Sequence, residues 1–183
     1  MRELTLDDLK KAGAVFRRCV PDLAEVYVLG SCSVVAWEPS IDAALRTSVD
    51  VDFSPVGRAL LYFDSKFVEQ WAGLESEFFE VNQFYIDYVT PDLLRCTPPG
   101  WQERVRVIEL AAGLAGHCLD PHDVAYNKLW AGRPKDILWV RGLIATGLIS
   151  MERLKVMHNG NPIPLEDHQK VSRSMQQVEQ AVG

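Results

Sequence analysis

The stretch Val49-Asp50-Val51-Asp52-Phe53 alternates strictly between apolar and acidic side chains, which is the pattern of a half-buried β-strand. Because side chains alternate across a strand, the Val and Phe side chains face one side, and Asp50 and Asp52 face the other. Two carboxylates so close together repel each other unless a cation lies between them, and Mg²⁺ prefers one or two carboxylates together with phosphate oxygens. The stretch therefore indicates a strand that carries a metal site. A solvent-facing strand with acids on its wet side is the simpler alternative.

A second strand, predicted over residues 25–29, runs directly into Gly30-Ser31, which opens a helix predicted over residues 33–37. A glycine lets a phosphate approach the backbone, and the first turn of a helix presents unpaired N–H groups to it. We therefore expect Gly30, Ser31 and Ser33 to bind the phosphates of a nucleotide.

The residues before the acidic strand, Arg46-Thr47-Ser48, supply a positive charge and hydroxyl groups next to the expected metal site. We count Arg46 and Ser48 among the nucleotide-binding candidates. Their position in the chain, directly before Asp50, is the reason for this expectation.

Asp87 lies inside an otherwise apolar stretch, FYIDYV (84–89), where an acid is locally out of place. If this strand lies beside residues 49–53, Asp87 completes a three-carboxylate site for two metal ions. Such a site suits in-line displacement at phosphorus. An outward-facing acid on an exposed strand is the alternative.

Other patterns in the first part of the chain predict further elements. Thr5-Leu6-Asp7-Asp8 forms a capping box for a helix that ends before Pro21. Phe63, Phe67 and Trp71 repeat every four residues, which predicts a crossover helix.

Further strands are predicted in the middle of the chain. Residues 78–81 and 84–89, separated by Asn82-Gln83, predict a hairpin. The stretch RVRVIEL (104–110) predicts another strand, with Arg104 and Arg106 on its polar face.

From Asp120-Pro121, which supplies a helix cap and a first-turn proline, the pattern becomes helical, with a break at Gly132–Pro134 and further helices near Met151 and Leu165. We expect an α/β (α+β) fold in which helices flank a small mixed sheet and the C-terminal part is helical. The expected domains are an α/β core, residues 1–119, and a helical part, residues 120–183, packed on it.

The composition fits an ordinary globular chain of 183 residues, with 48% hydrophobic and 24% charged residues and a net charge of −6. A general nucleic-acid coat protein would be basic, so nucleic acid would have to meet a local basic patch. The four cysteines show neither CxxC pairs nor zinc-ligand spacing, and no apolar run is long enough for a membrane span. We expect a soluble, cytoplasmic protein that does not bind membranes. The absence of GxxxxGK[ST] and GxGxxG argues against ATPase and dinucleotide-binding functions.

The ordered motifs resemble those of a known superfamily. A Gly-Ser turn followed by Arg-Thr-Ser-Val-Asp-Val-Asp (46–52) is similar to the nucleotidyltransferase superfamily of the DNA polymerase beta type. The stretch KLWAGRPKD (128–136) resembles the Lys-Leu-x-Ala…Arg-x-Lys-Asp motif of AbiEii/MenT-like nucleotidyltransferases and of related bacterial domains. The resemblance covers residues 24–150.

The resemblance implies roles for particular residues. It makes Asp50 and Asp52 ligands of Mg²⁺ (with Mn²⁺ as the alternative), Ser31 a phosphate-binding residue and Lys128 a contact of the nucleotide phosphates. Asp87 corresponds to the third acid of the superfamily by its place on a later strand. The remaining nucleotide-binding candidates of the second motif are Arg133, Lys135 and Asp136, and a structural role for Asp136 in holding Arg133 or Lys135 is the alternative.

The expected function is transfer of a nucleoside monophosphate from an NTP to an RNA 3′ end, such as that of a tRNA, or to a protein hydroxyl. The resemblance also implies a toxin–antitoxin or phage-defence setting, with a toxin or antitoxin as partner. The alternative is a non-catalytic binding or interaction protein of the same fold. An enzyme needs all three carboxylates to converge, whereas a binding module needs only the fold.

Overall fold

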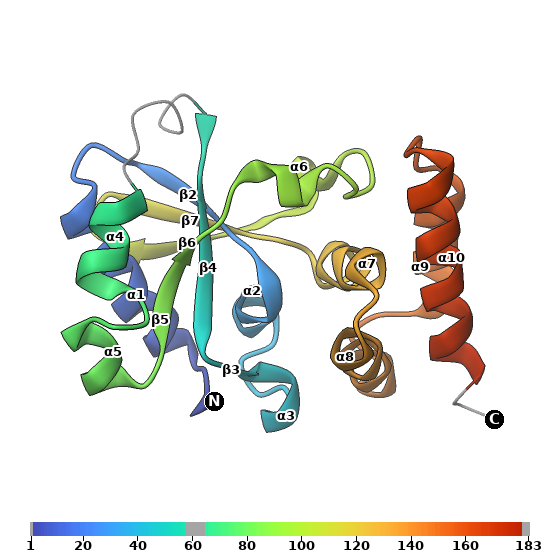
Figure 1. The fold of residues 1–183 in the computed structure, drawn as a ribbon, viewed down its shortest axis with the longest axis horizontal. Coiled ribbons are helices and arrows are strands. Elements are labelled where there is room, and N and C mark those ends of the chain that lie inside the picture. Colours follow the sequence, from blue (N-terminus) through green and yellow to red (C-terminus); the bar gives the residue numbers. More distant parts are fainter. Residues whose placement is uncertain (1, 58–64, 181–183) are drawn as a thin grey trace. The chain divides into compact units, whose positions relative to one another are not determined.

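The computed structural model describes residues 2–57 and 65–180 and shows a mixed α/β fold (Figure 1). The chain forms two compact units. The first comprises Met1–Thr90 and Val105–Leu119, and the second comprises Pro91–Arg104 and Asp120–Gly183. Residues 91–104 thus belong with the helices that follow residue 119, although two strands of the first unit lie between them in the sequence.

The first unit is built on a five-stranded mixed sheet in the order β5-β4-β2-β7-β6. The central strand β2 pairs antiparallel with β4 and parallel with β7, while β4 pairs parallel with β5 at one edge and β7 pairs antiparallel with β6 at the other. The strands are β2 (Glu25–Val28), β4 (Asp50–Pro55), β5 (Tyr85–Tyr88), β6 (Arg106–Ala111) and β7 (Leu114–Cys118). A separate two-stranded ribbon joins β1 (Arg2–Glu3) to β3 (Thr47–Ser48).

One face of this sheet forms the core, to which α1 (Leu6–Cys19), α2 (Gly30–Trp37) and α4 (Ser65–Ala72) contribute buried side chains. Val51 and Phe53 are fully buried on this face, and the Phe53 ring meets Phe16 edge to face at 5.1 Å. The alternation predicted for β4 is therefore confirmed, and it leaves the two acids on the opposite face. The short helix α3 (Ala43–Arg46) lies between α2 and β3 in the chain.

The predicted capping box is confirmed. Thr5 Oγ1 accepts from the Asp8 N–H at 3.2 Å, and Asp8 Oδ2 accepts from the Thr5 N–H at 3.0 Å, so both ends of the box are satisfied. The predicted crossover helix is present as α4, which contains Phe67 and Trp71, whereas Phe63 lies outside the described residues.

The predicted hairpin is wrong. Its first arm is the helix α5 (Glu77–Asn82), which Ser76 caps by accepting from the Phe79 N–H at 3.2 Å. Gln83 then adopts a left-handed conformation (φ 60°) and ends the helix. Asn82-Gln83 is thus a helix terminus, and β5 pairs with β4 in parallel, which requires the crossover through α4 and α5.

The predicted strand of residues 104–110 begins later than expected. Arg104 ends the helix α6 (Trp101–Arg104), and its guanidinium binds Asp123 and the carbonyls of Pro98 and Pro99. Arg106 is the first residue of β6. The short strand β7 was not predicted, because Gly116 and small neighbours weaken its strand pattern.

The second unit is helical in its described residues. Asp120 Oδ1 accepts from the His122 N–H at 2.8 Å and starts α7 (Pro121–Ala131), and Gly132 ends it with φ 67°, so both predicted boundaries are confirmed. The other helices are the 3-10 turn η2 (Pro91–Leu94), α6, α8 (Pro134–Ala145), α9 (Met151–Asn159) and α10 (Leu165–Gln180). Across residues 2–57 and 65–180, every helix is too short or too polar to span a bilayer.

Candidate functional site

The three predicted carboxylates lie on one face of the sheet, at the β5 edge. In the parallel pairing of β4 and β5, Asp52 is the partner of Asp87 and Asp50 is the partner of Tyr85. Paired residues of neighbouring strands project to the same side, and Asp50 and Asp52 share that side through their spacing of two. The register therefore places Asp50, Asp52 and Asp87 together on the sheet face opposite to that of Val51 and Phe53.

The acids influence each other electrostatically. Partial removal from water and the negative charge of Asp50, with a further contribution from Glu69 of α4, raise the pKa of Asp87. Burial and the charges of Asp50, Asp87 and Asp52 raise the pKa of Tyr85 in the same way. This face thus has a negative potential that a cation would relieve.

Tyr85 was not among the predicted site residues. The signal for it was present, because Tyr85 and Asp87 are two residues apart on the same strand and so share a face.

The donor set fits a hard divalent cation by its chemistry, because carboxylate oxygens are the ligands that Mg²⁺ prefers. Asp50 and Asp52 are half-buried, and Asp87 is exposed at the sheet edge. Within residues 2–57 and 65–180, however, no three His, Cys, Asp or Glu side chains lie close enough together to hold a metal ion. The three acids share a face and an electrostatic field without forming a closed ligand set.

The turn from β2 into α2 lies directly against one of these acids. Gly30 has φ 62°, and a Cβ placed on it would overlap Asp52 Oδ2 and come within 3.3 Å of Asp52 Cγ. Leu29, the residue before the helix, makes no side-chain capping hydrogen bond, so the first-turn amides of α2 have no side-chain cap from this position. The predicted phosphate-binding turn, Gly30-Ser31, is thus in contact with the predicted metal-binding strand.

The residues that precede β4 are paired within the first unit. Ser48 Oγ donates to Asp50 Oδ1 at 2.6 Å and so orients that carboxylate. Arg46 Nη2 pairs with Glu3 Oε2 at 3.0 Å, while its buried Nε has no hydrogen-bond partner in the described part of the chain. Ser48 therefore acts on the acidic face through Asp50, and the charge of Arg46 is already compensated.

Ser33 does not take the position expected for a phosphate ligand. Its side chain is fully buried, and Oγ donates to the Leu119 carbonyl at 3.0 Å, which ties α2 to the end of β7. Ser33 follows Ser31 by two residues on α2, so the two side chains lie on different sides of the helix, with Ser33 buried and Ser31 half-buried. Burial raises the pKa of the neighbouring Cys32 thiol well above its usual value, and the charge of Asp52 adds to the shift, so the thiolate is disfavoured.

The second motif forms an ion-pair cluster within the second unit. Asp136 is 1% exposed, and its carboxylate contacts Lys128 Nζ at 3.4 Å and Arg133 Nε at 2.5 Å. Burial alone would raise the pKa of Asp136, but the Arg133 hydrogen bond and the Lys128 charge lower it below its usual value. Lys128 also lies over the Trp139 ring, at 4.8 Å from its centroid, whereas Lys135 is exposed. Asp136 thus holds Arg133, the contact that its structural alternative predicts, and also pairs with Lys128.

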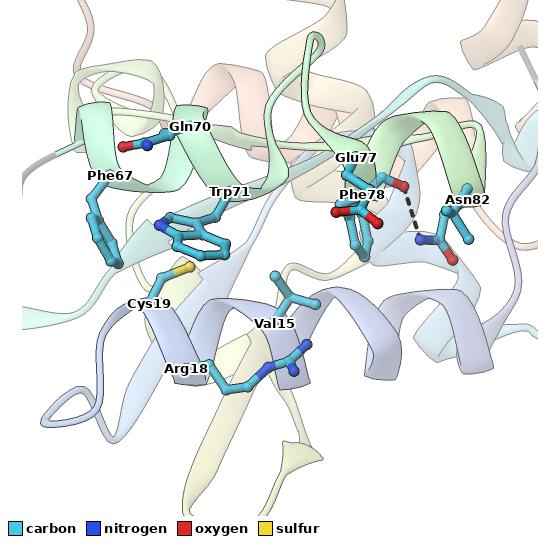
Figure 2. A pocket seen from close by; sticks show the side chains of 10 residues that line it. Val15, Arg18, Cys19, Phe67, Gln70, Trp71, Glu77, Phe78 and Asn82 are labelled. Atoms are coloured by element: carbon cyan, nitrogen blue, oxygen red, sulfur yellow. Dashed lines mark hydrogen bonds between the residues drawn. The ribbon is translucent and has the colours of Figure 1, made fainter.

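A cavity of about 700 Å³ lies elsewhere in the first unit, between α1, α4 and α5. Figure 2 shows side chains of α4 and α5, among them Trp71 and Phe78, pointing toward α1. None of the predicted site residues lines it, and it adjoins the core side of the sheet rather than the acidic face.

Comparison with known proteins adds the family. No curated protein matches the chain. The family model described as "nucleotidyltransferase of unknown function (DUF6036)" matches residues 15–180, a span that contains both the Gly30-Ser31 turn with its adjoining acidic strand and the Lys128–Asp136 motif. The chain therefore belongs to this nucleotidyltransferase family.

Proposed function

We propose that the protein is a Mg²⁺-dependent enzyme that transfers a nucleoside monophosphate from an NTP to an acceptor hydroxyl. The observation that carries the proposal is the contact between Gly30 and the Asp52 carboxylate, with Asp50 and Asp87 on the same sheet face. The turn at the start of α2 is suited to bind phosphates, and the adjacent acids are suited to bind cations. A metal-bound triphosphate requires the two side by side.

Each group of the chain has a defined part in this proposal. Asp50, Asp52 and Asp87 would hold the metal ions, which would close the ligand set that the three acids leave open, and Ser48 orients Asp50. Ser31 and the first amides of α2 bind the triphosphate, so that pyrophosphate is held as it leaves. When bound, Mg²⁺ (or Mn²⁺ in its place) would neutralise negative charge on the attacking and leaving oxygens.

The finer parts of the proposal rest on the sequence resemblance. The acceptor is an RNA 3′ end or a protein hydroxyl, and the resemblance to AbiEii/MenT-like enzymes favours a toxin–antitoxin or phage-defence setting. Lys128, Arg133 and Lys135 are proposed to neutralise triphosphate charge. Of these, Lys135 is the exposed cation that carries no ion pair with Asp136.

The test is incubation with each α-labelled NTP, Mg²⁺ and either total RNA or total protein. We expect one NTP to label an acceptor, Asp52→Asn to abolish labelling, and chelation of divalent ions to do the same. Asp22→Asn, which changes an exposed acid on the β2 side of the α1–β2 loop, is the matched control and should label normally.

A non-catalytic protein of the same fold would give a different pattern. It would bind a non-hydrolysable NTP analogue, measured by calorimetry, yet label nothing under any condition. Binding and labelling that are both unchanged in Asp52→Asn would contradict the site itself.

A further inference from the structure

A second row of side chains continues the acidic face toward the middle of the sheet. Tyr27 of β2 is the register partner of Ser54 on β4 and of His117 on β7. Ser54 follows Asp52 by two residues, so this row shares the face of the carboxylates. At about 3.3 Å per residue, it lies about 6.6 Å further along the strands. Tyr27 and His117 lie one and two strands further across the sheet, at about 4.8 Å per strand. Ser54, Tyr27 and His117 are called the aromatic row.

The aromatic row contains polar atoms that the protein itself does not satisfy. Ser54 is fully buried, and its Oγ has no hydrogen-bond partner in the part of the chain that the structure describes. The same holds for the buried Nε2 of His117, whose nearest acid, Glu25, lies at 3.6 Å, beyond hydrogen-bond distance. Buried polar atoms without partners are rare and call for an explanation, such as a ligand.

The same row presents aromatic surface. The Tyr27 and His117 rings meet edge to face at 5.8 Å with an interplanar angle of 69°. Tyr27 and His117 are half-buried, and aromatic side chains on a sheet face are the platforms on which single-stranded nucleic acids stack their bases. Flat rings next to unsatisfied hydrogen-bonding atoms match the chemistry of a nucleobase, which has a π-face and polar edges.

The aromatic row and the Gly30-Ser31 turn lie on opposite sides of Asp52, which separates the place of the triphosphate from that of the acceptor. The Leu29 N–H donates to the Asp52 carbonyl at 3.0 Å, so Gly30-Ser31 lies on one side of Asp52 along the strands, and Tyr27, opposite Ser54, lies on the other. In-line displacement puts the leaving pyrophosphate and the attacking hydroxyl on opposite sides of the phosphorus. With the triphosphate on the turn, the attacking group comes from the side of the aromatic row.

We propose that the aromatic row binds the terminal nucleobase of an RNA acceptor and so presents its 3′-hydroxyl to the carboxylates. This inference rests on the proposed function and selects RNA over a protein as the acceptor. The base would stack on Tyr27 and exchange hydrogen bonds with Ser54 Oγ and His117 Nε2.

The test uses short RNAs that carry 2-aminopurine, a base whose fluorescence is quenched by stacking, at the 3′ end or in the interior. Full-length protein should quench the terminal probe. Tyr27→Val keeps a strand-forming residue but removes the ring, and should lose the quenching and about tenfold in affinity. Tyr27→Phe, the matched control, should retain both, and the affinity for a non-hydrolysable NTP should be equal in all three proteins.

Ser54→Ala is a second variant in case Tyr27→Val lowers the thermal midpoint, because it removes one hydroxyl and adds no volume. It should weaken binding of the RNA end several-fold. Unchanged quenching and affinity in both variants would overturn the proposal, as would undiminished labelling of a protein acceptor by Tyr27→Val. Tyr27-dependent binding of the RNA end without any nucleotide transfer would instead support the row and contradict the proposed enzymatic function.

Discussion

Gly30 and Asp52 are in contact where β2 turns into α2, and this contact joins the two halves of the candidate site. The Asp52 carboxylate occupies the space that a side chain on Gly30 would fill. Gly30 also has φ 62°, a conformation that other residues adopt only with strain. Glycine is therefore required at this position for two reasons: the backbone has a positive φ, and the Asp52 carboxylate leaves no room for a side chain.

Gly30→Ala should weaken Mg²⁺-dependent NTP binding about tenfold or more, because it displaces a carboxylate whose charged contacts are worth about 1.5–3 kcal/mol. Strain at positive φ should also lower the free energy of unfolding by about 1–2 kcal/mol. Gly147→Ala is the matched control, since Gly147 has φ 77° with no atom within 4 Å of its added Cβ. It should lose the same stability with normal NTP binding, as measured by denaturation and calorimetry. Equal NTP binding in the two variants would argue against a site at Gly30.

The coupling between Asp50 and Asp87 should be measurable without any enzymatic activity. Because the Asp50 charge contributes to the raised pKa of Asp87, Asp50→Asn should lower that pKa toward the ordinary value. Mg²⁺ should lower it in the unmodified protein, since a cation favours the ionised carboxylate. Carboxyl ¹³C chemical shifts followed through a pH titration give both results. A pKa of Asp87 that responds to neither change would separate Asp87 from the site.

Ser31 and Ser33 should respond differently to the same substitution. Ser31→Ala should weaken NTP binding while leaving the thermal midpoint unchanged. Ser33→Ala should leave NTP binding unchanged but lower the free energy of unfolding by about 1–2 kcal/mol, because it leaves the buried Leu119 carbonyl without its donor. Calorimetry and thermal melts on both variants test the pair, and the reverse pattern would show that the phosphates bind further into α2.

Much of the fold follows from local patterns. The capping box, the alternation through β4 and the Asp120 cap each depend on neighbouring residues, and each is confirmed. The shared face of Asp50 and Asp52 follows from alternation alone. The register of Asp52 against Asp87 does not, because it depends on a crossover through two helices rather than on a turn.

The errors have physical reasons. Asn82-Gln83 is a turn signal that fits a hairpin and a helix terminus equally well, and Ser76 as a helix cap decides for the helix. The strand around Gly116 has a weak strand pattern, and it is held by tertiary packing: a Cβ on Gly116 would lie 2.7 Å from the Leu110 side chain. Such packing between strands is not visible in a single sequence.

Substitutions of Lys128 and Lys135 should distinguish a contribution to stability from a contribution to NTP binding. Lys128→Met should lower the free energy of unfolding by about 1–2 kcal/mol, because the buried Asp136 keeps only Arg133 as an ionic partner. Lys135→Met should leave stability unchanged, since Lys135 is exposed. Both should weaken NTP binding if the motif neutralises triphosphate charge. Chemical denaturation and calorimetry measure the two effects, and normal NTP binding in both variants would limit the motif to a structural role.

His158, a buried histidine of the second unit, should make stability depend on pH. The His158 ring bonds Tyr126 Oη at 2.9 Å and Ser172 Oγ at 2.8 Å, and it stacks on His168 at 3.7 Å. Burial and the His168 charge lower the pKa of His158 below 6.5. Below about pH 6.5, the unfolded chain therefore takes up a proton that the folded chain refuses until the pH reaches the lowered pKa. Stability should thus fall as the pH drops from about 6.5, and the loss should level off below the folded pKa.

His158→Gln should flatten this dependence, and His168→Gln, which removes only the second cause, should give an intermediate slope. Urea denaturation at several pH values between 7 and 5 measures it. A His158→Gln protein that loses as much stability over this range as the unmodified chain would assign the effect to other groups.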